Sequence, residues 1–232
     1  MFTLEIVPHV YQLTNRAVNT LVIAEEELTL IDTGFHGNSV RIADFIRQLG
    51  RSLEEVKLII LTHNHFDHIG GLTELKGITR AKVAAHQAAI AGGEGEPPYP
   101  EGVRRLLRIP FLSSLSRRFL LQPEDVDLPL KGGEVLGPLG GLQVIHTPGH
   151  TPDSISLYSP RYRLLVVGDA LVKRRRVLQL PYKMVSTNLP QAIDSVRKMA
   201  QLEVDIICFG HGRPVTEGAQ AMLAELIERS GG

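Results

Sequence analysis

Apolar and polar positions alternate along the first 35 residues with the two-residue period of β-strands. The alternation predicts four short strands, at residues 3–7, 10–14, 20–24 and 28–31. The period then becomes helical: Asn38 or Ser39 can cap a helix that Gly50 ends, with apolar positions at Val40, Ala43, Ile46 and Leu49. Strands followed by alternating helices and strands predict an α/β fold.

Four short apolar runs in the rest of the chain each end just before a histidine or an aspartate. Continuous apolar runs of this length are typical of strands that are buried on both faces. Runs 58–61, 142–145, 164–167 and 206–209 lead to His63, His150, Asp169 and His211, respectively. Side chains just past the carboxyl ends of such strands are free to converge on a crevice. Helices expected at about 190–202 and 217–228 would complete two α/β halves packed together.

The densest group of polar side chains is His63-Asn64-His65-Phe66-Asp67-His68. Imidazoles two positions apart point the same way from an extended backbone, so His63 and His65 can chelate one ion. Asp67 and His68 project from the following turn and can reach a second position. These four side chains are hard to accommodate as packing residues, because each would need a buried partner. Together with the three residues downstream, they predict a metal site.

Five ordered motifs resemble those of the metallo-β-lactamase superfamily. They span residues 32–212 and are Asp32-Thr33-Gly34, His63-x-His65-x-Asp67-His68, Thr147-Pro148-Gly149-His150-Thr151, Gly168-Asp169 and Gly210-His211-Gly212. The resemblance implies an α/β fold, specifically a four-layer αββα sandwich, with a dinuclear site at one edge of its paired sheets. We therefore expect residues 1–232 to form a single catalytic domain of the metallo-β-lactamase type.

The resemblance also implies a role for each side chain of the motifs. A first divalent metal would be held by His63, His65 and His150, and a second by Asp67, His68 and His211. Asp169 would bridge the two ions. Asp32 would be a supporting acid that orders the site without being a ligand. We expect both ions to be zinc, although imidazole and carboxylate ligands also suit iron or manganese.

The residue at the bridging position distinguishes branches of the superfamily. Secreted β-lactamases commonly place a cysteine there, whereas a ligand set made only of histidine and aspartate, with Asp169 as the bridge, resembles the glyoxalase II-like and lactonase-like hydrolases. We therefore expect a metal-dependent hydrolase that cleaves a small ester, thioester or lactone. Two ions that share a water lower its pKa from about 15.7 towards 7, so that a metal-bound hydroxide can attack the substrate carbonyl. Asp67 would also act in catalysis, by accepting a proton from that water.

The segment at about 92–131 interrupts the strand pattern. It opens with a stretch rich in Gly and Pro, and five arginines lie among apolar residues at 104–118. We expect an insertion that packs on the domain and covers the site as a lid, and a membrane-surface helix or a phosphate-binding patch are the alternatives. Further along, the basic stretch 173–176 is expected to be a solvated loop, and attraction of an anionic substrate is the alternative. Tyr182 and Lys183 follow it in a loop with a proline, and both are candidate substrate contacts.

Two other activities of the superfamily remain open at this point. A phosphodiesterase or nuclease would use the same metal pair, with the basic stretches 104–118 and 173–176 as a track for phosphates. An iron-dependent oxidoreductase would use a mononuclear iron centre, which the complete second set of ligands disfavours.

Composition limits the kinds of molecule that the protein is expected to bind. The 25 Lys and Arg residues balance 25 Asp and Glu residues, so no global field attracts nucleic acid, and a small-molecule substrate is favoured. A single cysteine excludes an intramolecular disulfide. The N-terminus lacks a cationic start followed by an apolar stretch, and no run approaches the length of a transmembrane helix. We therefore expect a cytoplasmic protein without a transmembrane segment, and the sequence carries no indication of its oligomeric state.

Overall fold

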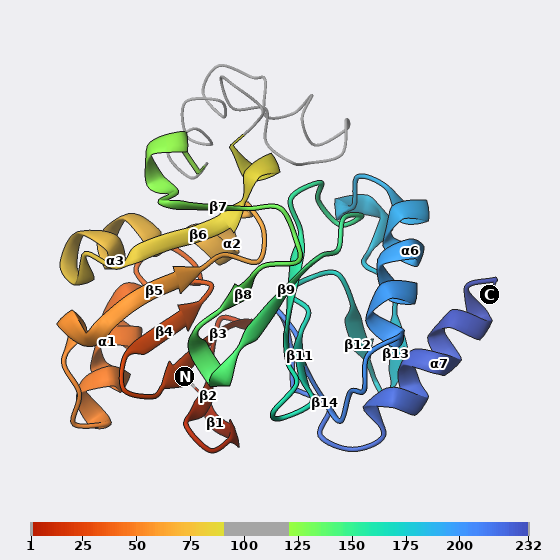
Figure 1. The fold of residues 1–232 in the computed structure, drawn as a ribbon, viewed down its shortest axis with the longest axis horizontal. Helices are drawn as coiled ribbons and strands as arrows, with labels where there is room; N and C mark the ends of the chain where they lie inside the picture. Colours follow the sequence, from red (N-terminus) through yellow and green to blue (C-terminus); the bar gives the residue numbers. More distant parts are fainter. Residues whose placement is uncertain (1, 91–120, 232) are drawn as a thin grey trace.

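The computed structural model describes residues 2–90 and 121–231. Within these ranges the helices and strands form four layers, with two sheets packed face to face and helices on both outer faces (Figure 1). The helices that cover the first sheet are α1 (Ser39–Gln48) and α3 (Leu72–Thr79), and those that cover the second are α6 (Leu189–Ala200) and α7 (Ala219–Arg229). The predicted α/β class and four-layer αββα sandwich are confirmed.

The first sheet contains seven strands in chain order: β1 (Phe2–Val7), β2 (Val10–Asn15), β3 (Val18–Ala24), β4 (Leu28–Ile31), β5 (Val56–Ile60), β6 (Lys82–His86) and β7 (Leu128–Leu130). Neighbouring strands from β1 to β4 are antiparallel, and those from β4 to β7 are parallel. Each parallel pair needs a crossover, and α1 and α3 supply the first two on the outer face of the sheet.

The second sheet has the strand order β14-β11-β10-β9-β8. Its strands are β8 (Val135–Leu136), β9 (Leu142–His146), β10 (Ile155–Ser159), β11 (Leu164–Val166) and β14 (Ile206–Cys208). A separate hairpin pairs β12 (Val172–Arg174) with β13 (Val177–Gln179). The stretch 173–176, expected to be a solvated loop, contributes Lys173 and Arg174 to β12 and Arg175 and Arg176 to the turn of this hairpin, and its three arginines are exposed.

Short 3-10 helices connect several of these strands. They are η1 (Leu53–Glu55), η2 (Gln87–Ala89), η3 (Pro123–Asp125), η4 (Pro138–Gly140) and η5 (Lys183–Val185).

The side chains of β3 show how the first sheet serves two cores. Val22 packs towards the helical side with Ile42 and Ile46 of α1. Leu21 and Ile23, on the opposite face, pack into the core between the sheets. A third core joins the second sheet to its own helices, through residues such as Met199 of α6 and Leu223 of α7. A strand buried on both faces needs apolar residues at consecutive positions, which explains the continuous apolar runs in the sequence.

The carboxyl ends of β5, β9, β11 and β14 meet at one edge of the paired sheets. In the second sheet β9 and β11 run in the same direction on either side of antiparallel β10, and β14 is parallel to β11. Backbone hydrogen bonds join the two sheets at this edge, from Ile155 N to Thr62 O at 2.9 Å and from Asn19 N to Gly210 O at 2.8 Å. The four loops that follow these strands are therefore held close together.

The insertion predicted at 92–131 falls mostly outside the described residues, and so does its Arg-rich part at 104–118. In the described part, Leu121 packs into the core beneath α1 and α3, and β7 pairs with β6 as the edge strand of the first sheet. Residues from Leu128 onwards thus belong to the sandwich itself, and the insertion ends earlier than the sequence indicated.

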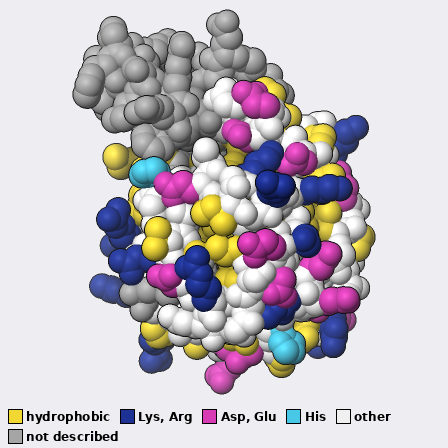
Figure 2. All heavy atoms as spheres, turned by 90° about the vertical axis from the view of Figure 1, so that its left-hand side faces the viewer, with side chains coloured by type: hydrophobic (Ala, Val, Ile, Leu, Met, Phe, Trp, Pro, Cys, Tyr) yellow, Lys and Arg dark blue, Asp and Glu magenta, His cyan; other side chains and the backbone are white. Residues whose placement is uncertain are grey.

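The face over α1 and α3 carries both signs of charge. Figure 2 shows Lys and Arg side chains intermingled with Asp and Glu side chains there, and ion pairs such as Arg47–Asp44 and Arg51–Glu55 lie on and beside α1. A track for a nucleic-acid backbone would need one sign of charge in a continuous stripe, which this described face lacks. In the ranges 2–90 and 121–231, no helix has both the length and the apolar character needed to span a membrane.

Candidate metal centre

All seven side chains predicted as metal ligands lie together at the shared edge of the two sheets. They come from four loops: His63 and His65 follow β5, Asp67 and His68 lie in the single-turn helix α2 (Phe66–Ile69), and His150, Asp169 and His211 follow β9, β11 and β14. Their nitrogen and oxygen atoms form three groups within 4.8 Å, namely His63-His65-His150, His63-His68-Asp169 and Asp67-His68-His211. The first and third groups share no residue, so the cluster offers two separate sets of three ligands.

Asp169 lies between these two sets. Its Oδ2 atom is 3.7 Å from Nε2 of His150 and 3.2 Å from Nε2 of His211. Its Oδ1 atom is 3.7 Å from Nε2 of His68. One carboxylate thus faces members of both sets, which is the placement that a bridging ligand requires.

Several polar atoms in the cluster are buried without a hydrogen-bond partner. Among the described residues, Nε2 of His63, Nε2 of His68 and Oδ1 of Asp169 have none. Leaving a buried polar atom unpaired is costly, and three such atoms facing one another are not explained by packing. Imidazole nitrogens and carboxylate oxygens are ligands of Zn²⁺, Fe²⁺ and Mn²⁺, so the donor set fits divalent cations.

The electrostatics of the cluster also divide it in two. Burial, reinforced by the positive charge of His68, holds the pKa of His63 well below its usual value. Burial, and the repulsion between the two rings when His150 is protonated, lower the pKa of His65 to about 3, and burial lowers the pKa of His150. These three histidines are therefore neutral at physiological pH, which is the form that binds a metal.

The other set contains ion pairs. Burial tends to lower the pKa of His68, but the carboxylates of Asp169 and Asp32 outweigh it and raise the pKa to about 9. For His211, hydrogen bonds to Asp169 and Asp67 overcome burial and raise the pKa to about 11. Burial alone would raise the pKa of Asp67 and of Asp169, but these histidines lower it in both cases. In the metal-free protein, protons on His68 and His211 balance the two carboxylates.

Asp32 lies beneath the cluster and is almost fully buried. Its Oδ1 accepts from Thr62 N at 2.8 Å, and its Oδ2 accepts from Thr62 Oγ1 and from His68 Nδ1, both at 2.8 Å. Thr62 Oγ1 in turn accepts from Nδ1 of His63 at 3.0 Å. Asp32 therefore holds His68 directly and His63 through Thr62, so that Nε2 of each ring faces the cluster.

Two contacts to the ligand side chains were not predicted from the sequence. Nδ1 of His211 donates to the carbonyl oxygen of Ala17 at 2.9 Å, and Nδ1 of His150 lies 3.4 Å from Oγ of Ser186. No sequence signal marks the first contact, because any residue at position 17 supplies a carbonyl. Ser186 belongs to no motif, but it lies close to Tyr182, which had been singled out.

Gly210 is required by the close packing of the cluster. A Cβ atom at this position would lie 2.2 Å from Oδ1 of Asp169 and 2.6 Å from Cε1 of His68. The glycine before His211 in the sequence motif therefore has a steric reason, since any side chain would displace two members of the cluster.

A cavity of about 470 Å³ opens onto the cluster. It is lined by His65, Asp67, His150, Asp169 and His211 of the cluster and by further residues that include Tyr182 and Lys173. Of the two predicted substrate contacts, Tyr182 lies on the cavity wall, whereas Lys183 is exposed and is not part of its lining.

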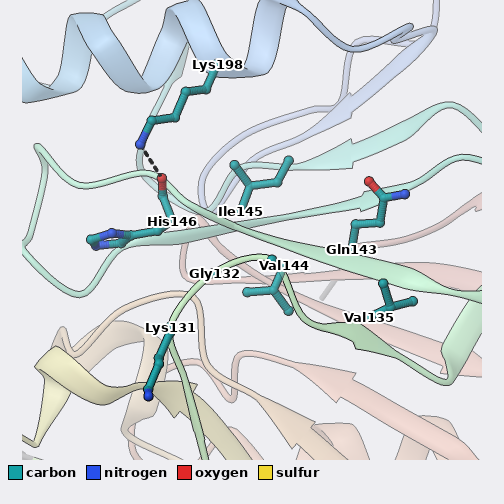
Figure 3. Close-up of a pocket in the computed structure, with 9 residues that line it drawn as sticks. Lys131, Gly132, Val135, Gln143, Val144, Ile145, His146 and Lys198 are labelled. Carbon is teal, nitrogen blue, oxygen red and sulfur yellow. Dashed lines mark hydrogen bonds between the residues drawn. The ribbon is translucent and has the colours of Figure 1, made fainter.

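A second hollow, of about 560 Å³, lies beside β9 (Figure 3). Lys198 Nζ donates to the carbonyl oxygen of His146 there at 3.2 Å, while the side chain of Lys131 points away from Lys198. His146 is the only histidine in its lining, which contains no carboxylate. This hollow therefore offers no set of metal ligands.

Comparison with known proteins gives three relevant similarities. A family model described as the metallo-beta-lactamase superfamily matches residues 13–211. The acyl-coenzyme A thioesterase MBLAC2 of Homo sapiens is 31% identical over 191 residues, which cover 76% of this chain and 66% of that protein. The hydroxyacylglutathione hydrolase GloC of Haemophilus influenzae is 28% identical over 208 residues, covering 84% of this chain and 85% of that one.

Among solved structures, a metallo-beta-lactamase family protein from Thermus thermophilus has the same fold. The two structures superpose with a TM-score of 0.74 at 24% identity, over 97% of this chain and 80% of the other.

Proposed function

The chain belongs to the metallo-beta-lactamase superfamily and is a metal-dependent hydrolase, and from this premise we propose that it hydrolyses thioesters at a dinuclear metal centre. The observation that carries the proposal is the pair of separate ligand sets with Asp169 between them. The two relatives named above act on acyl-coenzyme A and on hydroxyacylglutathione, and both compounds are thioesters.

Each ligand set would hold one ion. His63, His65 and His150 would bind the first as neutral imidazoles, and Asp67, His68 and His211 would bind the second after two protons have left. Asp169, whose carboxylate faces members of both sets, would help to hold both ions. Zinc is the metal that we propose for both positions, since four-coordinate nitrogen and oxygen sites suit it.

When bound, such a metal pair polarises the thioester carbonyl and supplies a nucleophile at neutral pH by lowering the pKa of water. The protein contributes the remaining features of the reaction. Asp67 is ionised at neutral pH because His211 and His68 hold its pKa below the usual value, and its side chain retains some exposure at the cavity. It can therefore accept a proton at a carboxylate oxygen, and we assign it the role of base.

The walls of the cavity would bind the substrate. Tyr182 lies on the wall and is the substrate contact that we propose, and Lys183 beside it would act only at the cavity mouth. A substrate bound between these walls would displace water from the cavity and so strengthen the electrostatic interactions within the site.

A phosphodiesterase with the same ligands is the second candidate. Lys173 on the cavity wall and the arginines of the β12–β13 hairpin favour it, because they would attract phosphate. The mixed charges of the face over α1 and α3 count against a long nucleic-acid substrate.

A panel of substrates tests the proposal directly. Metal-reconstituted protein would be assayed on thioesters, lactones, β-lactams and phosphodiesters, beside the same protein treated with a chelator. We expect the highest kcat/KM on thioesters and its loss in the chelated sample. Faster cleavage of phosphodiesters than of any thioester would favour the second candidate instead.

A further inference from the structure

Exposed apolar side chains concentrate at the mouth of the metal cavity. In the described residues, eight large apolar side chains are at least 40% exposed, and four of them are Phe66, Tyr182, Met184 and Val185. Three of these four, Phe66, Tyr182 and Val185, line the cavity. Single exposed apolar residues are ordinary on a protein surface, whereas a group of them around a cavity marks a binding surface. We call Phe66, Pro181, Tyr182 and Val185 the apolar wall.

The apolar wall is fixed to the His150 side of the cluster. Ser186 Oγ donates to the carbonyl oxygen of Tyr182 at 2.8 Å and lies 3.4 Å from Nδ1 of His150. The backbone N–H of Thr187 points at the carbonyl oxygens of Gly149 and His150, at 3.1 and 3.0 Å. Phe66 contributes to the wall from a different loop, the one that carries His65, and its ring packs on Phe35.

The part of the cavity next to His211 carries a cation. Lys173 lines it and donates to the carbonyl oxygen of Pro214 at 2.8 Å, three residues after His211. Arg213 directly precedes Pro214 in the chain and therefore lies near Lys173, and burial together with the charge of Arg213 lowers the pKa of Lys173. No carboxylate within the described ranges forms an ion pair with either of them, and an ammonium retains further donors after one hydrogen bond. Two neighbouring cations without an acidic partner favour an anionic ligand.

We propose that the cavity binds its substrate in one orientation, with an apolar acyl chain on the apolar wall and an anionic thiol portion towards Lys173. The inference rests on the proposed thioester hydrolysis and narrows its substrate class. The preferred substrates are thioesters of medium-length apolar acids with an anionic thiol, whose carbonyl group lies at the cluster between the two walls. Short acyl groups and uncharged thiols each leave one wall without a contact.

Kinetics on two series of thioesters test this orientation. Acetyl, butanoyl, hexanoyl and octanoyl groups would be joined either to coenzyme A, which is anionic, or to uncharged N-acetylcysteamine. Each methylene that becomes buried should raise kcat/KM by up to about fourfold. The increase should appear mainly in KM, because the acyl chain lies away from the reacting atoms. The coenzyme A thioester should be preferred over its uncharged counterpart at every chain length.

Two variants test the apolar wall and Lys173 separately. Val185→Ser should lower the octanoyl-over-acetyl ratio of kcat/KM by about threefold to tenfold. Lys173→Met should lower the preference for coenzyme A over N-acetylcysteamine by about fivefold. Val135→Ser and Lys57→Met are the matched controls and should change neither ratio, because both side chains are exposed and lie outside the metal cavity.

Binding without turnover provides an independent measurement. Wild-type protein should bind the thioether S-octyl-coenzyme A more tightly than S-methyl-coenzyme A in calorimetry, and Val185→Ser should reduce this difference. Thioester hydrolysis that is insensitive to chain length and thiol charge, with equal binding of the two thioethers, would overturn the orientation and leave the proposed function standing. Absence of hydrolysis on every thioester would overturn the proposed function, while a preserved difference in thioether binding would still support the two walls.

Discussion

Nδ1 of His68 donates a hydrogen bond of 2.8 Å to Oδ2 of Asp32, and both side chains are almost completely buried. A carboxylate can only accept, so the proton resides on Nδ1 and Nε2 of the ring faces Asp67 and Asp169. The same carboxylate oxygen accepts from Thr62 Oγ1, which orients His63. One buried acid thus sets the direction of two imidazoles that belong to different ligand sets.

Asp32→Asn should weaken metal binding while leaving the fold intact. The carboxylate accepts three hydrogen bonds, whereas an amide would turn an NH₂ group towards at least one of these donors. Loss of such a supporting contact lowers metal affinity by about 10-fold to 100-fold. Competition with a chromogenic chelator measures this affinity, and Asp44→Asn on the exposed face of α1 is the control. Unchanged affinity in Asp32→Asn would mean that Asp32 only stabilises its turn.

Gly210→Ala should disrupt the cluster through a single methyl group. The added carbon would overlap Asp169 and His68, which cannot move without losing their contacts. We expect a loss of bound metal and a drop in activity of more than about tenfold, measured by metal analysis and thioester assay on the same sample. Gly77→Ala is the matched control: it lies in α3 with no atom within 4 Å of the new carbon, and should be neutral or slightly stabilising. Equal metal content in both variants would contradict the steric argument.

His65→Ala and Asp169→Ala should lose both metal and turnover. His65 belongs to the first ligand set, and Asp169 lies between both sets, so its removal should lower the metal content further. Circular dichroism should show that both variants remain folded, because neither side chain belongs to a hydrophobic core. Full activity in either variant would rule out the proposed chemistry.

Metal uptake should release protons. Neighbouring carboxylates raise the pKa of His68 to about 9 and that of His211 to about 11, so both rings are protonated at neutral pH before metal binds. A bound metal requires the free nitrogen, and each ring must then lose a proton. Protons compete most strongly at low pH, so apparent affinity should increase as pH rises towards about 9. Calorimetry in buffers of different ionisation enthalpy counts the protons, and a pH-independent affinity without proton release would contradict this charge assignment.

Much of the fold could be predicted because its strands are local and strongly patterned. The four strands expected before residue 32 agree with β1 to β4 to within two residues at each end. The prediction of the buried face of α1 was less accurate. Val40 was expected on the apolar face but is 61% exposed, and the buried face contains Ile42 and Phe45. Helical spacing alone does not identify the face that meets a sheet, because tertiary packing selects among neighbouring apolar stripes.

The cluster could be predicted because its ligands follow buried strands in recognisable motifs. What could not be predicted depends on contacts between distant loops. The carbonyl of Ala17 reaches His211 across 194 positions of the chain, and backbone atoms leave no mark in a sequence. The hairpin that contains the basic stretch 173–176 was not predicted, because each of its strands is only three residues long and four consecutive cations obscure any alternation.

The most direct test of the central claim is a titration of metal-free protein with Zn²⁺ while thioester hydrolysis is followed. The account predicts no hydrolysis without metal, and a rate that stops rising only when two ions are bound per chain. A rate that is complete at one ion per chain, or undiminished hydrolysis by the metal-free protein, would contradict a dinuclear hydrolase.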